Sequence, residues 1–417
     1  MACFRVEGGK RLMGEIRVHS AKNAVLPLMA ASIMAEEPVT LTECPDISDV
    51  KHMGEILQTL GCDVRCEEGG VCMDSQGLCG WEMPDHLSKQ IRSSIFMLGP
   101  ILARFKKARV TYPGGCEIGL RPIDLHLQGL RCLGAQIHEE GGMIHCDGRQ
   151  MKAGTVHFDY PSVGATENVM MAAVMLPGET WIHNAAREPE IEDLQRFLNA
   201  CGARVTGAGS QTIRVEGVDK LHGAVYSPMA DRIVAGTLLA AAAITGGEIC
   251  LKNAPVKEMV AITSKLKEMG CILEEESAQM CLWAPQRLKA FAQLQTQPHP
   301  GFPTDMQVQM LALAAVAEGT SLMVENVFEN RFTHAGDINR MGGHVLVNGR
   351  TAVVHGVECL HGRRVTARDL RGGAALVLAG LCAQGVTLVE QAELVDRGYD
   401  HFEMMLNSLG AAVTRLA

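Results

Sequence analysis

Hydrophobic and polar positions along the chain follow a pattern that occurs six times. Each copy contains an amphipathic stretch with apolar residues at helical spacing, such as residues 50–60, and then a glycine followed by another apolar position. The glycine stands where the end of a helix needs a left-handed residue, and the apolar position after it begins a strand. Each copy therefore predicts a helix, a glycine cap and a strand.

The glycines of this pattern are almost evenly spaced. They are Gly61, Gly134, Gly202, Gly270, Gly342 and Gly410, at spacings of 73, 68, 68, 72 and 68 residues. Self-similarity at a nearly fixed period indicates a repeated structural unit. The period is longer than that of familiar solenoid repeats, so it favours closed α/β domains over an open superhelix.

A second pattern alternates with the first: a helix that is apolar on nearly all sides, then a turn and a strand rich in β-formers. The six predicted helices are residues 24–35, 93–104, 170–176, 238–244, 311–317 and 374–383. Helices of this kind belong in a buried core. One repeat cannot cover its own apolar faces, whereas three make a domain of ordinary size, so six repeats predict two domains.

The composition is that of a folded chain without a general affinity for polyanions. Of the 417 residues, 47% are hydrophobic and 20% are charged, which excludes disorder. Aromatic residues make up only 4% and the net charge is −9, so we expect no nucleic-acid partner and only local anion sites. The chain starts without a signal peptide and has no apolar run long enough to span a bilayer. It is therefore predicted to be cytoplasmic, with no membrane partner.

The fifteen cysteines are scattered over the chain without a Cys-x-x-Cys pair. The densest group, Cys62, Cys66, Cys72 and Cys79, lacks the second half of a zinc site, so we expect no metal. We interpret fourteen of the fifteen as reduced thiols without a catalytic role. The exception is Cys116.

Basic residues stand at the predicted starts of several buried helices, where they oppose the helix dipole. They are Lys22, Arg92, Arg232 and Arg371. Free backbone N–H groups beside a cation make a local phosphate or carboxylate site. The alternative is that each cation pairs with a nearby acid, as Asp231 and Asp369 could do for their neighbours.

Two loops rich in glycine and proline hold further candidates. In residues 113–126, Arg121 and His126 can stabilise a thiolate at Cys116, unless this cysteine is only incidentally exposed. Residues 298–305 lead into a buried helix at Asp305, which either accepts a proton from a hydroxyl or serves as a plain N-cap. Residues 327–332 form a charged and aromatic cluster that is equally compatible with a salt-bridged turn.

Motifs from end to end of the chain carry a resemblance to a known family. They include Ser20-Ala21-Lys22-Asn23-Ala24, Pro113-Gly114-Gly115-Cys116, Arg121-Pro122-Ile123-Asp124-Leu125-His126, Ser162-Val163-Gly164-Ala165-Thr166, Phe302-Pro303-Thr304-Asp305-Met306-Gln307, Phe328-Glu329-Asn330-Arg331-Phe332 and Asp396-Arg397-Gly398-Tyr399. With these motifs the chain resembles the UDP-N-acetylglucosamine 1-carboxyvinyltransferases, which are enolpyruvyl transferases.

The resemblance implies an α/β fold of two similar domains, each with three β-α-β-α-β-β repeats in an inside-out α/β barrel. It places the active site in the interdomain cleft. The implied domains are residues 1–20 plus 230–417, and residues 21–229, which carry the Cys116 loop.

The resemblance also implies a reaction. The enolpyruvyl group of phosphoenolpyruvate passes to the 3′-hydroxyl of UDP-N-acetylglucosamine, and phosphate is released. This is the first committed step of peptidoglycan precursor synthesis and the target of fosfomycin. Addition–elimination through a tetrahedral intermediate needs no metal or other cofactor, and the partners are the two small-molecule substrates.

Individual roles follow from the motif positions. The catalytic set is Cys116, Asp305, Lys22, Arg397, Asn23 and Asp369. Cys116 either donates a proton to the methylene carbon or forms a covalent adduct, and Asp305 is a general base or orients the attacking hydroxyl. The phosphoenolpyruvate contacts are Lys22, Asn23, Arg121, Arg371 and Arg397. The UDP-N-acetylglucosamine contacts are Arg92, Arg121, Pro122, Ile123, Asp124, Leu125, Ser162, Val163, Asp305 and Val327.

Some positions depart from the family pattern, and rival functions remain. Tyr160 stands where some members carry lysine, and Val234 and Ala235 where an acid is common. The nearest rival is the shikimate-pathway enolpyruvyl transferase, whose usual Gly-Ser-Lys-Ser start and lack of a loop cysteine do not fit this chain. A paralogue that binds nucleotide sugar without turnover and a non-catalytic repeat scaffold are further alternatives.

Overall fold

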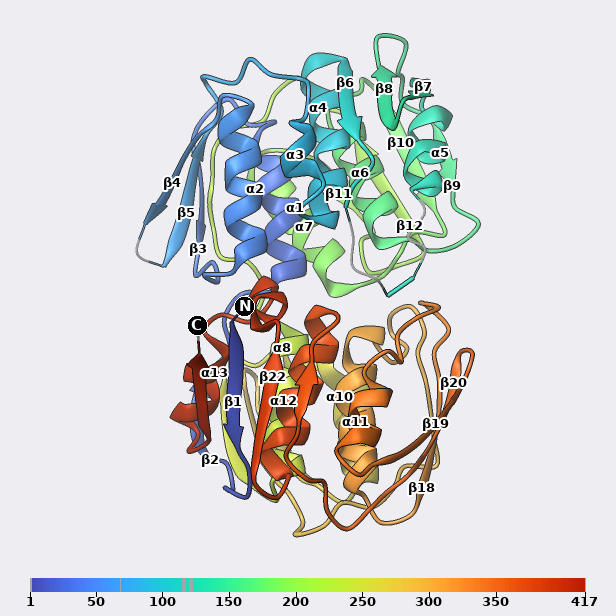
Figure 1. The fold of residues 1–417 in the computed structure, drawn as a ribbon. Helices are drawn as coiled ribbons and strands as arrows, with labels where there is room; N and C mark the ends of the chain where they lie inside the picture. The colour runs from blue at the N-terminus through green and yellow to red at the C-terminus, as the bar shows by residue number, and fades with distance from the viewer. Residues whose placement is uncertain (1, 68, 115–117, 120–122, 417) are drawn as a thin grey trace. The chain divides into compact units, whose positions relative to one another are not determined.

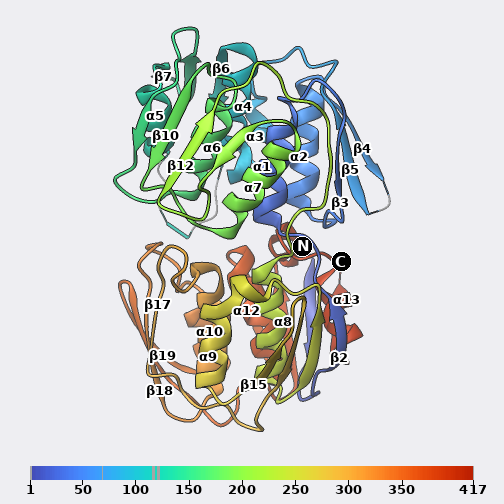
Figure 2. The same cartoon turned by 180° about the vertical axis from the view of Figure 1, so that it is seen from behind.

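The computed structural model describes residues 2–67, 69–114, 118–119 and 123–416. The chain forms two compact units. Unit 1 contains the chain up to His19 and from Ala230 onward, and unit 2 contains most of Ser20 to Met229. In each unit, helices fill the inside and small sheets lie around them (Figures 1 and 2).

Within the described residues, five of the six sheets have four strands in one common order. In each, the strand after a central helix pairs in parallel with one neighbour and antiparallel with the other. In unit 2 the sheets are β13 (Val225–Tyr226), β3 (Val39–Thr42), β5 (Gly70–Asp74) and β4 (Asp63–Glu67); β6 (Lys107–Thr111), β8 (Met143–Asp147) and β7 (Gln136–Glu140); and β9 (Thr155–His157), β10 (Glu179–His183), β12 (Thr212–Glu216) and β11 (Arg204–Thr206).

The sheets of unit 1 repeat this order. They are β2 (Met13–Arg17), β14 (Glu248–Lys252), β16 (Gln279–Trp283) and β15 (Ile272–Glu275); β17 (Gln293–Gln295), β18 (Thr320–Val324), β20 (Thr351–His355) and β19 (His344–Asn348); and β21 (Arg364–Thr366), β22 (Val386–Glu390), β1 (Cys3–Glu7) and β23 (Ala412–Leu416). The start of the chain thus completes the sheet formed by its end, because β1 pairs with both β22 and β23.

The second repeat departs from the common order. Its sheet has three strands, and the parallel strand expected beside β6 is reduced to a single bridge between Glu82 and Arg109. The Met83 N–H donates to the Arg109 carbonyl at 2.8 Å. The chain before this bridge therefore supplies only a remnant of the strand that the other repeats have.

The six glycine caps are confirmed. All six glycines have φ between +92° and +100°, a region that favours glycine. Each ends a helix: α2 (Ser48–Thr59), α5 (Asp124–Cys132), α7 (Pro189–Ala200), α9 (Val260–Glu268), α11 (Ala335–Arg340) and α13 (Phe402–Ser408). At each cap the next residue's N–H bonds back to a carbonyl five residues earlier, as Cys62 does with Leu57, which is the Schellman pattern.

The predicted buried helices are also confirmed, with starts earlier than the apolar pattern alone predicts. They are α1 (Lys22–Ser32), α4 (Leu98–Phe105) after the 3₁₀ segment η1 (Arg92–Met97), α6 (Val163–Ala173), α8 (Arg232–Ile244), α10 (Thr304–Val316) and α12 (Leu370–Cys382). Each unit has one hydrophobic core around three of them. The fold class is therefore two similar α/β units of three repeats, and in the described chain the sheets stay separate and do not close into a continuous barrel.

The cysteine prediction needs one correction. Cys250 on β14 and Cys281 on β16 are opposite each other in an antiparallel pair and form a disulfide, with Cα atoms 4.0 Å apart. Neighbouring strands bring such partners close although 31 residues separate them in the sequence. The other described cysteines are free.

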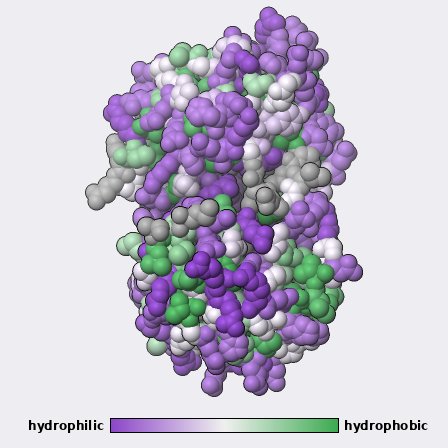
Figure 3. All heavy atoms as spheres, viewed as in Figure 1, coloured by the Kyte–Doolittle hydropathy of each residue, from purple (hydrophilic) through white to green (hydrophobic). Residues whose placement is uncertain are grey.

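The surface in Figure 3 is mostly hydrophilic, with apolar residues in small separate groups. Large apolar side chains that are exposed include Met404 and Leu346. Among the described residues, no helix combines the length and apolar character that a membrane span requires. Within the same residues, no three His, Cys, Asp or Glu side chains are grouped so as to hold a metal ion.

Candidate active-site residues in each unit

Asp305 in unit 1 is held by two buried arginines. It is the second residue of α10, and Pro303 occupies the N-cap position, so the interpretation of Asp305 as a plain N-cap is wrong. One carboxylate oxygen, Oδ1, accepts from Arg331 Nη2 at 2.6 Å, and the other lies 3.3 Å from Arg371 Nη2. The side chain of Asp305 is 27% exposed, whereas those of Arg331 and Arg371 are 2% and 3% exposed. The Asp305 carboxylate is thus partly accessible, and the two arginines that hold it are buried.

Asp369 is the N-cap of α12 and does not bind the guanidinium of its neighbour. Its Oδ1 accepts from the backbone N–H groups of Arg371 and Gly372 at 3.0 and 2.9 Å. Asp369 and Arg371 thus lie side by side at the start of α12. The Arg371 guanidinium, however, extends to Asp305, and Arg331 Nη1 approaches Asp369 at 4.0 Å.

The charges of this cluster compensate one another in a buried environment. Burial by itself would lower the pKa of Arg371, but Tyr399, Asp305 and Asp231 outweigh it and raise that pKa. The guanidinium is therefore permanently charged. Burial lowers the pKa of the neighbouring His334 to about 4; Asp369 opposes this shift and Arg331 adds to it. His334 is consequently a neutral imidazole at physiological pH.

A buried glutamate organises the loop next to Asp305. Glu325 accepts from the hydroxyls of Thr296 and Thr304 at 2.8 and 3.0 Å. Its Oε1 also accepts from the backbone N–H groups of Val327 and Phe328. This carboxylate therefore fixes the predicted substrate contact Val327 relative to the first residue of α10.

Arg397, the remaining predicted residue of unit 1, is the last residue of the 3₁₀ segment η3 (Ala392–Arg397). It is partly exposed. The neighbouring Asp396 pairs with Arg415 at 2.6 and 2.7 Å.

In unit 2, Lys22 is the first residue of α1 and is buried. Its ammonium lies 2.6 Å from Asp49 Oδ2, and the Asp49 side chain is 1% exposed. At Lys22, therefore, the structure has the alternative arrangement, in which an acid pairs with the cation at the helix start. Asn23, the next residue, is exposed.

Arg92 and His126 form the second polar group of unit 2. Arg92 begins η1, and its Nη1 lies 3.5 Å from the Pro113 carbonyl oxygen. Burial, with a smaller effect from Arg92, lowers the pKa of His126 to about 3. His126 Nδ1 lies 2.8 Å from the Asn168 amide nitrogen, and a Cβ at Gly164 would come within 2.8 Å of the imidazole. Glycine at this position therefore lets the start of α6 approach the ring.

The other predicted contacts of unit 2 lie at two helix starts. Ile123 is the N-cap of α5, followed by Asp124 and Leu125. Ser162 is the N-cap of α6 and accepts from the Ala165 N–H at 3.4 Å, and Val163 is the first helical residue. Cys116, Arg121 and Pro122 lie outside the described residues, so their predicted roles stay predictions.

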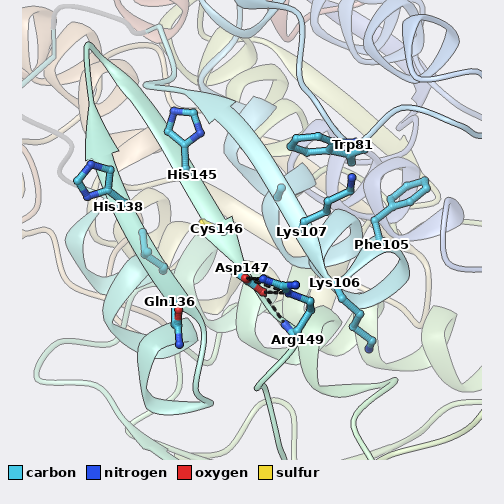
Figure 4. A pocket seen from close by; sticks show the side chains of 12 residues that line it. Trp81, Phe105, Lys106, Lys107, Gln136, His138, His145, Cys146, Asp147 and Arg149 are labelled. Carbon is cyan, nitrogen blue, oxygen red and sulfur yellow. Dashed lines mark hydrogen bonds and ion pairs between the residues drawn. The ribbon is translucent and has the colours of Figure 1, made fainter.

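A surface groove of unit 2 contains none of the predicted residues. Its volume is about 740 Å³, and it lies over β6, β8 and β7, with Trp81, Lys107, His138, His145 and Arg149 among its lining residues (Figure 4). Lys107 Nζ lies 4.0 Å from the centre of the Trp81 ring, and Arg149 pairs with Asp147. Two of the basic side chains are thus occupied by neighbours within the groove, and the groove gives no support for a site.

Arg331 is the main residue to which sequence reasoning assigned no role. The motif of residues 328–332 included it, yet neither its pairing with Asp305 nor its full burial followed from the motif. A signal was present, because an arginine inside a charged and aromatic segment needs an acidic partner when it is buried. Its partner is 26 residues away, in the preceding helix.

Solved structures define the class of fold. The enolpyruvyl transferase NikO from Streptomyces tendae superposes with a TM-score of 0.90 at 22% identity, covering 99% of this chain and 98% of that one. EPSP synthase from Acinetobacter baumannii superposes with a TM-score of 0.76 at 19% identity over the whole of both chains. At these identities the likeness shows that the fold is that of enolpyruvyl transferases.

Sequence relatives make the assignment more specific. The family model described as EPSP synthase (3-phosphoshikimate 1-carboxyvinyltransferase) matches residues 6–406. The chain is 49% identical over 416 residues to UDP-N-acetylglucosamine 1-carboxyvinyltransferase 2 of Caldanaerobacter subterraneus subsp. tengcongensis, covering 100% of both chains. It is 48% identical over 413 residues to UDP-N-acetylglucosamine 1-carboxyvinyltransferase of Desulfovibrio desulfuricans, covering 98% of each. The chain belongs to the UDP-N-acetylglucosamine 1-carboxyvinyltransferases, within the wider EPSP synthase family.

Proposed function

We propose that the protein transfers the enolpyruvyl group of phosphoenolpyruvate to the 3′-hydroxyl of UDP-N-acetylglucosamine and releases phosphate. The observation that carries the proposal is the Asp305 carboxylate on its two buried arginines, in a chain whose full-length relatives are named for this activity. The reaction would supply the first committed intermediate of peptidoglycan synthesis in the cytoplasm. The two units would be its domains, residues 1–20 plus 230–417 and residues 21–229.

Asp305 acts on the acceptor hydroxyl in this proposal. Two guanidinium groups in contact with a carboxylate favour its charged form and fix its orientation. A carboxylate so stabilised is better suited to accepting a hydrogen bond and aligning the hydroxyl than to taking its proton permanently. Its partly exposed side chain supports access by a substrate. Asp305 is therefore proposed as the residue that orients the attacking oxygen.

Phosphoenolpyruvate, the enolpyruvyl donor, needs cations that bind it and an acid that protonates it. Phosphoenolpyruvate carries a phosphate and a carboxylate, for which Lys22, Asn23, Arg121, Arg371 and Arg397 are the proposed contacts. Lys22 is charge-paired and buried, which fits a fixed ammonium at the start of α1. Cys116 is the proposed proton donor to the methylene carbon, and a covalent adduct on the same sulfur is its alternative role. Protonation of that carbon makes C2 electrophilic, and the hydroxyl oxygen adds there while its proton passes to Asp305 as a transient acceptor. The C2–O bond to phosphate then breaks and the methyl carbon loses a proton, which restores the double bond; the proton released by the hydroxyl leaves with the phosphate.

The acceptor contacts are proposed at the starts of α5, α6 and η1. Arg92, Arg121, Pro122, Ile123, Asp124, Leu125, Ser162, Val163 and Val327 are the proposed residues, together with Asp305. Helix starts present free backbone N–H groups, which suit the diphosphate of a nucleotide sugar. The Ser162 hydroxyl and the Arg92 guanidinium would add side-chain donors.

The test is release of inorganic phosphate from phosphoenolpyruvate. We expect release when both substrates are present and none when UDP-N-acetylglucosamine is omitted. Asp305→Asn should reduce the rate at least about 100-fold, because it removes the charge that aligns the hydroxyl. Shikimate 3-phosphate replaces UDP-N-acetylglucosamine in a parallel assay, since the matching family model is described by that acceptor. Release only with shikimate 3-phosphate, or with neither acceptor, would overturn the proposal.

A further inference from the structure

Arg371 rests on an aromatic ring that none of the proposed roles uses. Its guanidinium carbon lies 5.2 Å from the centre of the Tyr399 ring, and its Nη2 lies 3.3 Å from Asp305 Oδ2. Tyr399 is 1% exposed and Arg371 is 2% exposed. A cation against an aromatic face is attracted most strongly when both are removed from water. The ring therefore limits the positions that the guanidinium can adopt.

The Tyr399 hydroxyl is anchored to two other central helices. Its oxygen lies 2.9 Å from Thr237 Oγ1 on α8 and accepts from Gln309 Nε2 on α10 at 3.2 Å. Gln309 Nε2 also donates to Thr237 Oγ1 at 3.0 Å. Because the Thr237 hydroxyl donates to the Ile233 carbonyl at 2.8 Å, Tyr399 must be the donor in its bond with Thr237. Every proton of the triad formed by Thr237, Gln309 and Tyr399 then has an acceptor.

The same tyrosine fixes the end of η3. Its backbone N–H donates to the Val395 carbonyl at 3.1 Å, and Arg397 is two residues before it. Tyr399 thus joins three elements: the segment that carries Arg397, the helix start that carries Arg371, and the paired cores of α8 and α10. The side chain of Tyr399 bears on Arg371, and its backbone N–H bears on the segment that carries Arg397.

We infer that Tyr399 is a positioning residue for the proposed reaction: its ring supports Arg371, and through Arg371 it holds Asp305 in the orientation that aligns the acceptor hydroxyl. The inference rests on the proposed function. The hydroxyl of Tyr399 supplies stability by anchoring the ring, and the ring itself supplies the geometry on which the rate depends.

Two substitutions at position 399 separate these contributions. Tyr399→Phe keeps the ring and loses the hydroxyl, whereas Tyr399→Met fills much of the same volume without a ring. Both should lower the melting temperature, because Thr237 and Gln309 each lose a partner. Only Tyr399→Met should lower kcat strongly, by about 30- to 100-fold, since a displacement of about 1 Å in a positioned group costs about that much. Tyr399→Phe should stay within about threefold of the wild type.

Two control variants should lose stability to a similar extent while the Tyr399 ring stays in place. Thr237→Val removes the partner of the Tyr399 hydroxyl from the opposite side. Tyr226→Phe removes a buried hydroxyl bond in unit 2, where Tyr226 Oη donates to Asp193 at 2.7 Å. Both should melt earlier than the wild type and keep its kcat. The KM for UDP-N-acetylglucosamine should change little in all four variants, because the effect lies in alignment and not in affinity.

Rates are compared per folded molecule, below the melting temperature of every variant. Wild-type kcat in a folded Tyr399→Met protein would overturn the inference, as would equal losses in Tyr399→Phe and Tyr399→Met. If Tyr399→Met does not fold, Tyr399→Leu replaces it under the same criterion, and retained kcat in either ringless variant is decisive. A wild-type protein that releases no phosphate would instead contradict the proposed function, and this inference would fall with it.

Discussion

The two units hold their polar residues by different means, although both are built from the same repeat. In unit 1, Asp305, Arg331, Asp369 and Arg371 compensate one another's charge in a continuous buried cluster. In unit 2, one ion pair between Lys22 and Asp49 stands at the start of α1. A second buried group there, His126, is neutral.

The two units also differ inside their hydrophobic cores, at the polar residue that stands sixth in a central helix. Thr237, Gln309 and Asn168 are the sixth residues of α8, α10 and α6. The first two bind the Tyr399 hydroxyl, which supports a charged cluster. Asn168 instead binds His126, the Ile95 carbonyl and the Gly99 N–H, so it joins helices without supporting a charge.

The comparison shows that one repeat can present a functional group in two ways. Unit 1 fixes a carboxylate with permanent cations, so its geometry should not depend on pH near neutrality. Unit 2 relies on a neutral imidazole and on residues at lightly capped helix starts. Substitutions in the charged cluster of unit 1 should therefore cost both stability and activity, whereas acid should act on both units through their buried neutral imidazoles, His334 and His126.

The largest expected effect comes from breaking the charged cluster. Arg331→Met takes from Asp305 the guanidinium at 2.6 Å and removes the guanidinium that approaches Asp369 at 4.0 Å. Removing one partner of a buried ion pair costs about 3–5 kcal/mol, because the remaining charge stays buried. We expect that loss in urea unfolding, together with at least about 100-fold slower phosphate release, since Asp305 loses its main support.

Arg350→Met is the matched control in the same unit. Arg350 pairs with Glu329 at 2.6 Å, and both side chains are 44% exposed. Exposed pairs contribute about 0–1 kcal/mol, so this variant should resemble the wild type in stability and rate. Equal stability losses in the two variants would show that the unit 1 cluster is no more than a set of ordinary surface pairs.

Acid stability tests the neutral imidazole of unit 2. Burial and then Arg92 lower the pKa of His126 to about 3 in the folded chain. Below its unfolded pKa of about 6.5, only the unfolded chain takes up the proton, so stability falls as pH falls. One such group costs about 2 kcal/mol between pH 7 and pH 5. His126→Gln should remove that part of the pH dependence in urea unfolding measured at pH 7, 6 and 5.

His138→Gln serves as the control for this experiment. Its side chain is 76% exposed, so this substitution changes an imidazole that the fold does not bury. The pH dependence of this variant should equal that of the wild type. If His126→Gln also keeps the wild-type slope, His126 titrates normally in the folded chain and the proposed contrast between the units loses its basis.

Local features of the fold were predictable from the sequence. The six glycines and the apolar stretches around them gave the capped helices, the buried helices and the strands that follow, because a glycine cap is fixed by residues within one helical turn. The starts of the central helices were harder to predict. Polar residues such as Lys22 and Arg232 begin these helices, and an apolar pattern does not include them.

Contacts between distant residues were not predictable in the same way. The motif resemblance named Asp305 and Arg371 but not their contact across 66 residues. The Tyr399–Thr237 bond spans 162 residues, and the Cys250–Cys281 disulfide depends on strand register. Such contacts depend on how whole repeats pack, which periodicity in a single chain does not specify.

The smallest expected effect concerns an acid in unit 2 that lacks the compensation seen in unit 1. Glu167 on α6 is fully buried, and neither of its oxygens has a hydrogen-bond partner in the described chain. Burial raises its pKa well above the usual value, and Glu190 and then Glu188 add to the shift. The folded chain therefore keeps a proton that the unfolded chain releases above pH 4.5, so this group makes folding less favourable as pH rises.

Glu167→Gln keeps the shape and removes the ionisation. It should match the wild type near pH 5 and exceed its free energy of unfolding by about 1 kcal/mol or more at pH 8. Glu192→Gln is the control, because its side chain is 44% exposed and pairs loosely with Arg196 at 3.9 Å. If Glu167→Gln is destabilising at pH 8 while the control is neutral, Glu167 is ionised and paired in the folded protein. Unit 2 would then contain a compensated buried charge in addition to the Lys22–Asp49 pair, and the contrast between the two units would be one of degree.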